Sequence, residues 1–490
     1  YTQPSDSGPY GSRRPNLLFM RVLFAASEVA PYSKAGGLGD VAGALPAALA
    51  ALGHDVLVVS PWYARLGGEA SPLWVGDVAV PFQGGWSDVG VGTLEARGVR
   101  FAFVGHPAFA RDGLYGYDDD PWRFALLSRA VPQVAARLGF EPDVVHANDW
   151  HTGHLPLVLS RGWHLPAGFA HLPSVFTVHN AQYQGESDMA RTLHWLRLPG
   201  DLAGSFASHF GRFNALKAGA GFATRVTTVS PTYAQELTQP EYGYGLDGAF
   251  RSLAGRLTGI LNGLDVSLWD PANDPHLPAP YDARHPNAKA ASQVALRERY
   301  GLEPGLPVIG VVSRLVAQKG IDLLLAAAPR LLEMGWGIVV LGTGERDVEA
   351  AALALAADAP GRVGVTIGFD EPLSRLVYAG SDALAMPSRF EPCGLSQMIA
   401  MRYGTLPIVR STGGLRDTVE HLRTGFVFEH ATADGVAWAA AEAWAVGPGT
   451  DRWRAMQQAA MRQDHSWEAS ARRYAALYEA ASMSVIPSRS

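Results

Sequence analysis

The sequence predicts an α/β protein with two parallel sheets, and three observations support this. From Arg21 onward, short apolar runs rich in β-branched residues alternate with longer helical stretches. The runs are almost continuously apolar, which is typical of parallel strands covered by helices on both faces. At about 150 residues per domain, a chain of 490 residues holds more than one hydrophobic core.

The first series of elements precedes residue 262. Its expected strands are 21–27, 55–60, 101–105, 144–148, 174–178 and 225–230, with expected helices at 38–52 and 122–138. The second series has expected strands at 308–313, 337–342, 363–368, 383–388 and 406–411, and expected helices at 320–333 and 346–358. Alternation of this kind predicts parallel sheets with right-handed crossovers.

A segment rich in Pro, Asp and Asn, at 269–286, separates the two series and is predicted to be a linker or long loop. We therefore predict two Rossmann-like, doubly wound domains, at 20–262 and 263–465, facing each other across a cleft. Residues 1–19 are expected to form a flexible tail, and a last helix at 466–485 is expected to cross back to the N-terminal domain.

Composition excludes several classes of protein. Hydrophobic residues make up 48% and charged residues 18%, which is ordinary for a globular protein and unlike a disordered or fibrous one. A net charge of −6 gives no field for a polyanion, so nucleic acid is not an expected partner. No run reaches the roughly 18 apolar residues of a membrane span, so no membrane partner is expected either.

The single cysteine, Cys393, excludes an intrachain disulfide and fits the reducing cytoplasm, which is the expected location. The pair Arg13-Arg14 resembles a twin-arginine export signal, but the strand with Glu28 that follows is not an apolar signal region, so export is disfavoured.

Polar and glycine-rich motifs follow the expected strands at their carboxyl ends. Because open parallel sheets bind ligands at these ends, the motifs predict one cleft between the two domains. They are Glu28 with KAGGLGD (34–40), Asp149-Trp150-His151, His179-Asn180, Arg314 with Lys319-Gly320, RFEPCGL (389–395) and TGGL (412–415).

Two of the motifs contain a lysine, although only four of the 40 basic residues are lysines. Gly36 and Gly37 leave room for backbone N–H groups to approach an oxyanion at a helix N-terminus, and Lys34 adds a compact charge. A tight turn with a surface lysine is an equally weighted alternative. Arg314 and Lys319 flank a strand-to-helix turn and can hold a diphosphate, the alternative being a surface ion pair.

Three further positions have both a ligand-binding and a structural interpretation. In TGGL, Gly413 and Gly414 bring a helix N-terminus close to the cleft, with Thr412 as a donor. Glu391 can accept hydrogen bonds from sugar hydroxyls, or it can be an acid that favours a helix N-terminus. Cys393 is expected to be a packed residue and not a nucleophile, because no histidine is evidently paired with it.

Two patterns resemble metal sites but do not favour one. Asp118-Asp119-Asp120 precedes Pro121 at an expected helix start, where acids also suit the helix dipole. His146, His151 and His154 do not have the spacing of a helix-face ligand pair. We therefore expect no metal.

Together these residues resemble bacterial glycogen synthases of the starch-synthase type, which are retaining glucosyltransferases with the GT-B fold. The resemblance covers essentially all of 20–480. The motifs that carry it are SEVAPYSKAGGLGDV, VVHANDWHTG, SVFTVHNAQYQG, LKAG, TTVSPTYAQE, LNGLD, VVSRLVAQKG, PSRFEPCGL and TGGLRDTV.

The resemblance implies a role for each matching residue. Arg314 and Lys319 would hold the distal phosphates of ADP-glucose, and Glu391, at the glucosyl group, would be essential for activity. Asp149 and His179 would line the cleft beside the reaction, and Tyr115 would lie on its sugar side. The other implied nucleotide-sugar contacts are Lys34, Gly36, Gly37, Asn262, Cys393, Gly394, Thr412, Gly413 and Gly414.

The sequence departs from the family pattern at four places. Ala35 replaces a threonine of the motif usually written KTGGL, which removes one hydroxyl. Asn148 replaces the second histidine of HAHDW. The loop at Tyr115 is shorter than in the family. Position 399 is Ile, so the E-x7-E pattern of related glycosyltransferases is not completed.

The implied reaction adds one glucose from ADP-glucose to an α-1,4-glucan such as glycogen and releases ADP, with neither a metal nor pyridoxal phosphate as cofactor. No carboxylate is securely placed for a double displacement, so a front-side retaining route is preferred. The alternatives are another GT-B enzyme, such as a sucrose- or trehalose-forming transferase or a phosphorylase, and a non-catalytic glucan-binding protein.

Overall fold

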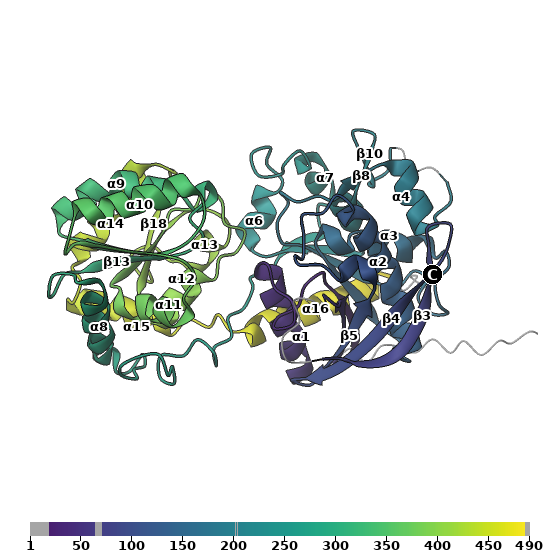
Figure 1. The fold of residues 1–490 in the computed structure, drawn as a ribbon, viewed down its shortest axis with the longest axis horizontal. Helices are drawn as coiled ribbons and strands as arrows, with labels where there is room; N and C mark the ends of the chain where they lie inside the picture. Colours follow the sequence, from purple (N-terminus) through teal and green to yellow (C-terminus); the bar gives the residue numbers. More distant parts are fainter. Residues whose placement is uncertain (1–18, 64–70, 201, 203, 486–490) are drawn as a thin grey trace, which may run out of the picture. The chain divides into compact units, whose positions relative to one another are not determined.

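A computed structural model of the chain describes residues 19–63, 71–200, 202 and 204–485. Its contacts divide the chain into two compact units (Figure 1). The first unit comprises Tyr1–Thr177, Tyr183–Val226 and Ala471–Ser490, and the second comprises Val178–Gln182 and Thr227–Ser470. Residues 1–18 of the expected tail, with Arg13 and Arg14, lie outside the described residues. None of the described helices is both long enough and apolar enough to cross a bilayer.

A nine-stranded sheet has the order β12-β11-β7-β6-β1-β2-β5-β4-β3. Strand β1 (Arg21–Ala25) pairs in parallel with β2 (Asp55–Pro61) and β6 (Val144–Asn148). These pair in turn with β5 (Val99–Gly105) and β7 (Ser174–Val178), again in parallel. Strands β11 (Arg225–Thr228) and β12 (Leu257–Gly259) complete that side. Almost every residue of β1 and β2 is buried, which explains their continuously apolar sequences.

The other edge of this sheet is an antiparallel hairpin that the strand pattern of the sequence did not predict. Strands β3 (Leu73–Phe82) and β4 (Gly85–Ala96) pair antiparallel with each other, and β4 pairs antiparallel with β5. The connecting residues Gln83 and Gly84 both have positive φ, 51° and 74°, as a tight hairpin turn of the primed type requires. The sheet is therefore mixed, with a parallel centre.

The first unit contains most of this sheet, without β12 and the end of β11, together with helices and a small sheet. The small sheet has the order β8-β10-β9. Helix α2 (Asp120–Arg137) has Pro121 in its first turn and buries Arg123, which pairs with Asp120 at 2.6 Å. The remaining elements are α1 (Gly37–Ala51), α2 (Asp120–Arg137), α3 (His154–Arg161), α4 (Met189–Leu196), α5 (Ala215–Phe222), β8 (Glu186–Ser187), β9 (Ser208–His209), β10 (Arg212–Asn214) and most of α16 (Trp467–Val485).

A six-stranded sheet forms the centre of the second unit, and all of its pairings are parallel. Its order is β15-β14-β13-β16-β17-β18, so the strand order reverses between β13 and β16. In open α/β sheets, ligands bind beyond the carboxyl ends of the strands at such a reversal. The strands are β13 (Val308–Val312), β14 (Gly337–Gly342), β15 (Val363–Ile367), β16 (Ala383–Met386), β17 (Leu406–Arg410) and β18 (Phe426–Phe428).

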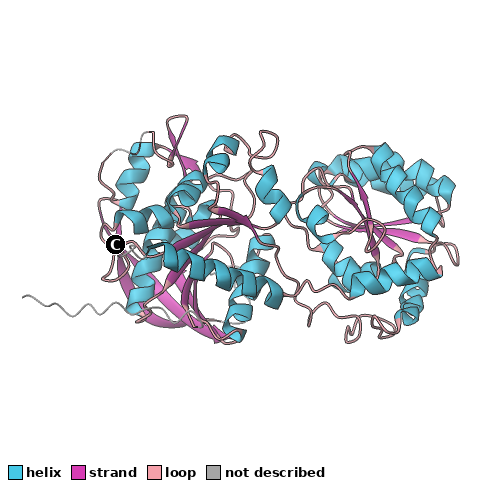
Figure 2. Cartoon of the chain, turned by 180° about the vertical axis from the view of Figure 1, so that it is seen from behind, coloured by secondary structure: helices cyan, strands magenta, loops and turns pink. Residues whose placement is uncertain are grey.

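Helices cover both faces of this sheet (Figure 2). Leu296 of α8 (Ala290–Tyr300) and Val377 of α11 (Glu371–Gly380) pack with Val308 and Val339 of the strands in one buried cluster. The helices of the second unit are α6 (Pro231–Glu236), α7 (Asp247–Ser252), α8 (Ala290–Tyr300), α9 (Ile321–Met334), α10 (Arg346–Asp358), α11 (Glu371–Gly380), α12 (Ser396–Arg402), α13 (Gly413–Thr418), α14 (Ala433–Val446) and α15 (Asp451–Met461).

The proline-rich segment 269–286 has no α-helix or strand, as a linker or loop would, and buried side chains anchor it within the second unit. The carboxylate of Asp274 is buried and pairs with Arg375 of α11 at 3.2 Å, and it accepts a 2.5 Å hydrogen bond from the Tyr403 hydroxyl. The Arg375 guanidinium also lies 4.4 Å from the ring centre of Trp269. Because breaking a buried ion pair is costly, these contacts fix the segment.

Candidate donor-binding and active site

A cavity of about 220 Å³ opens at the carboxyl ends of β13 and β16 in the second unit. This is where the strand order reverses, and therefore where a ligand is expected. The cavity combines two cations and three hydroxyls with an apolar floor, which suits a phosphorylated ligand. Its lining residues are Val312, Ser313, Arg314, Lys319, Ile321, Ala385, Met386, Ser388 and Ser396.

Lys319 forms an ion pair with Glu391, a contact that the spacing of the two residues in the sequence does not predict. The two side chains pair at 2.5 Å, and the Ser388 hydroxyl donates to the same carboxylate oxygen at 3.1 Å. Gly320 makes this approach feasible: it has φ +66°, and a Cβ there would lie 2.0 Å from the carbonyl oxygen of Pro387. Only glycine lets the turn before α9 lie against the end of β16.

Arg314 lies at the exposed side of the same cavity. Its guanidinium donates to Oε1 of Gln318 at 3.3 Å, and the amide of Gln318 donates to the carbonyl of Phe390 at 3.3 Å. Gln318 thus connects the arginine to the loop that carries Glu391. Both predicted phosphate-binding cations therefore line one cavity, with Glu391 in direct contact with one of them.

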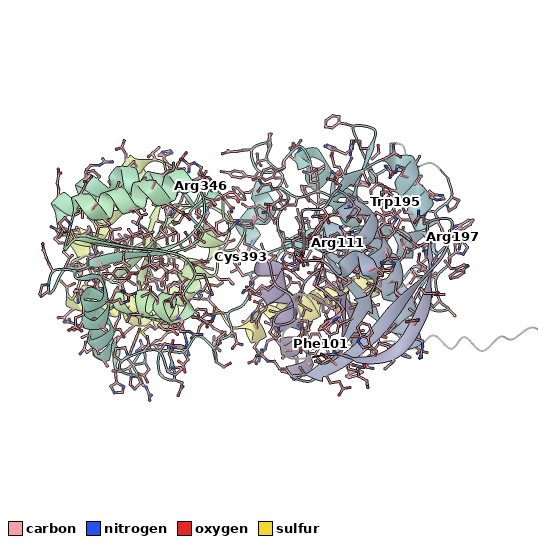
Figure 3. The ribbon with its side chains drawn as sticks, in the orientation of Figure 1. Phe101, Arg111, Trp195, Arg197, Arg346 and Cys393 are labelled. Atoms are coloured by element: carbon pink, nitrogen blue, oxygen red, sulfur yellow. The ribbon has the colours of Figure 1, made fainter. Side chains whose placement is uncertain are left out.

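Cys393 is buried in the loop after β16 (Figure 3). Burial raises the pKa of its thiol to about 12, although the backbone N–H of Asn262 donates to the sulfur. The thiol therefore stays protonated at neutral pH and is not a nucleophile, in keeping with its expected packed role. Oδ1 of Asn262 is also buried, and it accepts no hydrogen bond from the described residues. The next residue after the cysteine, Gly394, has φ +73°.

The TGGL turn packs directly onto this loop. A Cβ on Gly413 would lie 2.0 Å from the carbonyl oxygen of Glu391, and one on Gly414 would lie 2.1 Å from that of Cys393. The N–H of Gly414 donates to the Glu391 carbonyl at 3.1 Å. The two glycines are therefore required for the close contact between two predicted ligand-binding loops.

The N-terminus of α13 already has an acceptor within the second unit. The carboxylate of Glu236, at the end of α6, accepts from the Thr412 hydroxyl at 2.8 Å and from the Gly413 N–H at 3.0 Å. Asp417 of α13 in turn accepts from the N–H and hydroxyl of Thr232, at 2.8 and 2.7 Å, at the start of α6. Each short helix is thus capped by an acid from the other. Burial raises the pKa of Glu236.

His179 follows β7 and also belongs to the second unit. Burial lowers the pKa of its imidazole to about 3. The ring is therefore neutral at physiological pH, so it offers a hydrogen-bond donor and an acceptor without a charge.

In the first unit, Asp149 stands at the carboxyl end of β6 in a strained conformation. Its φ is +56° and its ψ is 176°, a region that residues other than glycine seldom adopt. Tyr115 lies nearby: its hydroxyl is 2.8 Å from Oγ of Ser27, and its ring centre is 4.6 Å from that of His151. Burial, followed by the negative charge of Glu28 and more weakly of Asp149, raises the pKa of Tyr115.

The loop that carries Lys34, Gly36 and Gly37 closes on a buried carboxylate. Glu28 accepts hydrogen bonds from the N–H groups of Ala35 and Gly36, the latter at 3.2 Å. Burial raises the pKa of Glu28. Lys34 is half-exposed and pairs with Asp40 of α1 at 2.7 Å. The Gly36 amide, one of those expected to face an oxyanion, therefore already has an acceptor in the same part of the chain.

Three residues of the two patterns that resembled metal sites, Asp119, Asp120 and His146, have partners within the protein. Asp119 forms a paired salt bridge with Arg111, at 2.5 and 2.6 Å, and Asp120 pairs with Arg123. Nδ1 of His146 is 2.8 Å from the Tyr478 hydroxyl of α16.

The structure also reveals three residues at these sites that the sequence did not single out. Ser388 orients Glu391, and Glu236 caps the TGGL turn. Phe369 follows β15 at the carboxyl edge of the six-stranded sheet, and 88% of its surface is exposed. An aromatic residue directly after the expected strand 363–368 was a usable signal for Phe369, whereas the other two depend on tertiary contacts.

Comparison with known proteins identifies the family. A family model described as the starch synthase catalytic domain matches residues 21–252, and one described as glycosyl transferases group 1 matches 292–460. A glycogen synthase of Deinococcus deserti is 49% identical over 470 residues, covering 94% of this chain and 99% of its own length. A glycogen synthase of Thermus thermophilus is 44% identical over 463 residues, covering 94% and 100%.

Solved structures agree. The catalytic domain of Starch Synthase IV from Arabidopsis thaliana, bound to ADP and acarbose, matches with a TM-score of 0.84 and 34% identity, covering 95% of this chain and 99% of that one. Sucrose-phosphate synthase from Thermosynechococcus elongatus, 19% identical with a TM-score of 0.59, shares the fold over 94% of this chain and 98% of its own. With such relatives over nearly its whole length, the chain belongs to the glycogen and starch synthase family and is a two-domain GT-B glycosyltransferase.

Proposed function

We propose that this glycosyltransferase moves glucose from ADP-glucose to the non-reducing end of an α-1,4-glucan, with retention of configuration and release of ADP. The observation that carries the proposal is the cavity in which Arg314 and Lys319 lie together, with Glu391 bound to the lysine. The Arabidopsis relative, whose structure holds ADP and acarbose, supports the choice of a nucleotide and a glucan.

The chemistry assigned to each group follows from its place. When the bond between C1 of glucose and the phosphate oxygen breaks, negative charge develops on the diphosphate. Arg314 and Lys319 would stabilise that charge from fixed positions, which is the most effective form of electrostatic catalysis. Lys319 and Ser388 both bind Oε2 of the buried Glu391 carboxylate. The other oxygen, Oε1, would accept hydrogen bonds from glucose hydroxyls.

Retention would follow a front-side route. In this route, the acceptor hydroxyl attacks C1 on the face that the phosphate leaves, and its proton passes to the departing phosphate oxygen. A double displacement would need a carboxylate on the opposite face. Trapping a covalent glucosyl-enzyme would overturn this part of the proposal. His179, neutral and close to a strand end, would donate or accept one hydrogen bond to the sugar.

The adenine ring would stack on Phe369. This side chain is almost fully exposed just after the end of β15. Strand β15 pairs with β14, and β14 pairs with β13, the strand that leads to Arg314. A large exposed aromatic side chain near the carboxyl edge of an α/β sheet is suited to a planar ligand.

We also propose that five residues of the first unit take part in the reaction: Lys34, Gly36, Gly37, Tyr115 and Asp149. A reaction without metal or pyridoxal phosphate, and a location in the cytoplasm, are also proposed.

A single assay tests the central proposal. Purified protein is incubated with glycogen and either ADP-glucose or UDP-glucose, and release of the nucleoside diphosphate is measured. We expect release that depends on glycogen and is faster with ADP-glucose. Release without any glycogen dependence, or exclusive use of UDP-glucose, would contradict the proposed acceptor or donor respectively.

A further inference from the structure

A second cavity, of about 410 Å³, opens in the second unit at the carboxyl ends of β17 and β18. Its volume falls in the range of roughly 300–1,000 Å³ that small-molecule sites occupy. None of its residues belongs to the donor-binding residues described above. We call it the edge cavity. Its lining residues are Ser411, Arg416, Val419, His421, Val427, Phe428, Glu429 and Trp438.

One wall of the edge cavity is a fixed aromatic platform. The indole of Trp438, on α14, is 51% exposed although large apolar side chains are normally buried. The His421 imidazole stacks on it with ring centres 5.8 Å apart and planes inclined by only 15°. Nδ1 of His421 accepts from the Val427 N–H at 3.1 Å, so the ring is locked and its other nitrogen carries the proton when the ring is neutral.

The rim of the edge cavity carries polar groups for which the described part of the chain supplies no partner. Among the described residues, the structure gives no hydrogen bond or ion pair to the guanidinium of Arg416, the carboxylate of Glu429 or the hydroxyl of Ser411. Other exposed arginines nearby behave differently: Arg423 pairs with Glu420 at 2.5 Å and Arg330 with Asp434 at 2.8 Å. The rim therefore offers donors and an acceptor that a ligand can use.

These features select one class of ligand. A pyranose ring has a C–H face that packs on an indole and a rim of hydroxyls that donate and accept hydrogen bonds. A phosphorylated ligand would meet the negative charge of Glu429, and a purely apolar partner would bury Arg416 and Glu429 unsatisfied. We propose that the edge cavity binds glucosyl units of an α-glucan away from the reacting centre; the choice of glucan over other sugars rests on the proposed function.

Such a site would act through effective concentration. A polymer held at the edge cavity presents its chain ends to the same molecule repeatedly, which strengthens overall binding without a new contact at the reacting centre. A short acceptor cannot occupy both places and gains nothing. The edge cavity should therefore affect the KM for glycogen and leave the kcat and the KM for a short maltooligosaccharide unchanged.

The experiment compares Trp438→Ala with Trp163→Ala, a control of equal exposure (51% and 50%) in the first unit. Binding is measured by retardation in a native gel containing glycogen and by calorimetry with maltoheptaose, and ADP affinity is measured in parallel. Thermal melting verifies folding, and Arg416→Gln provides a second variant should Trp438→Ala melt early.

We expect Trp438→Ala to bind glycogen about tenfold more weakly, the change that loss of one aromatic contact of about 1.4 kcal/mol produces. ADP affinity and the control variant should be unchanged. Wild-type retardation of both edge-cavity variants, equal loss in Trp163→Ala, or a loss confined to ADP would each overturn the proposal. Because binding needs no turnover, failure of the wild type to release ADP from ADP-glucose would count against the proposed reaction alone.

Discussion

At the scale of single residues, Asp149 shows how backbone strain marks a candidate functional position. Its φ of +56° with ψ of 176° lies in a region that is essentially restricted to glycine. Strain of this kind costs about 1–3 kcal/mol and persists where the surroundings fix it. The carboxylate is therefore held where it is at the expense of stability, as expected of a residue placed for function.

This interpretation predicts that glycine at position 149 gives a more stable protein than alanine does, the reverse of the usual order. Asp149→Gly and Asp149→Ala both remove the carboxylate, but only glycine adopts positive φ without strain. We expect Asp149→Gly to be more stable than Asp149→Ala by about 1–2 kcal/mol, and both to lose activity. Chemical denaturation measures the difference. At the exposed helical position Ala351, glycine should instead destabilise by about 1 kcal/mol; equal stabilities of the two Asp149 variants would refute strain there.

Lys319 carries the most specific prediction for activity. Its ammonium group lies in the cavity and holds Glu391 at 2.5 Å, so alanine would remove a stabilising charge and leave a buried carboxylate without its cation. Removing one such donor typically costs about 10²–10³ in kcat, and we expect that loss for Lys319→Ala in the ADP-release assay. Arg330→Ala, which removes an exposed cation further along α9, should be nearly neutral. Near-normal turnover of Lys319→Ala would contradict the assignment.

At the scale of helices and strands, the sequence predicts best where burial is uniform. The expected strands at 144–148, 174–178 and 337–342 coincide with β6, β7 and β14, because strands buried on both faces read as continuous apolar runs. The hairpin β3–β4 escaped prediction because none of the first seven residues of β3 is buried and β4 is buried only in part, which breaks such a run. Its turn uses Gln83-Gly84, a weaker signal than the favoured Asn-Gly.

Some residues of the candidate site are likewise predictable from the sequence, and others are not. Arg314, Lys319, Glu391 and the glycines that support them are predictable, since charged residues and glycines that follow parallel strands commonly mark the ligand-binding edge of a sheet. The Glu236–Thr412 bond is different: it joins residues 176 positions apart, and nothing local distinguishes Glu236 from any other acid at the end of a short helix. Its role follows only from the pairing of α6 with α13.

At the scale of the whole molecule, ligand binding should be visible as stability. A ligand that binds only the folded protein stabilises it, by about 2.7 kcal/mol at a concentration one hundred times its Kd. ADP should therefore raise the melting midpoint of the wild type. The midpoint shift is the measured quantity, because a chain with two compact units need not unfold in one step.

The same measurement tests the expectation that the nucleotide is held by side chains and needs no metal ion. If Arg314 and Lys319 neutralise the diphosphate, the ADP-induced shift should be the same with an excess of EDTA as with magnesium. It should shrink strongly in Arg314→Ala and Lys319→Ala and stay unchanged in Arg330→Ala. A shift that appears only with magnesium would mean that a cation shares the phosphates, and the two basic residues would then be insufficient to account for binding.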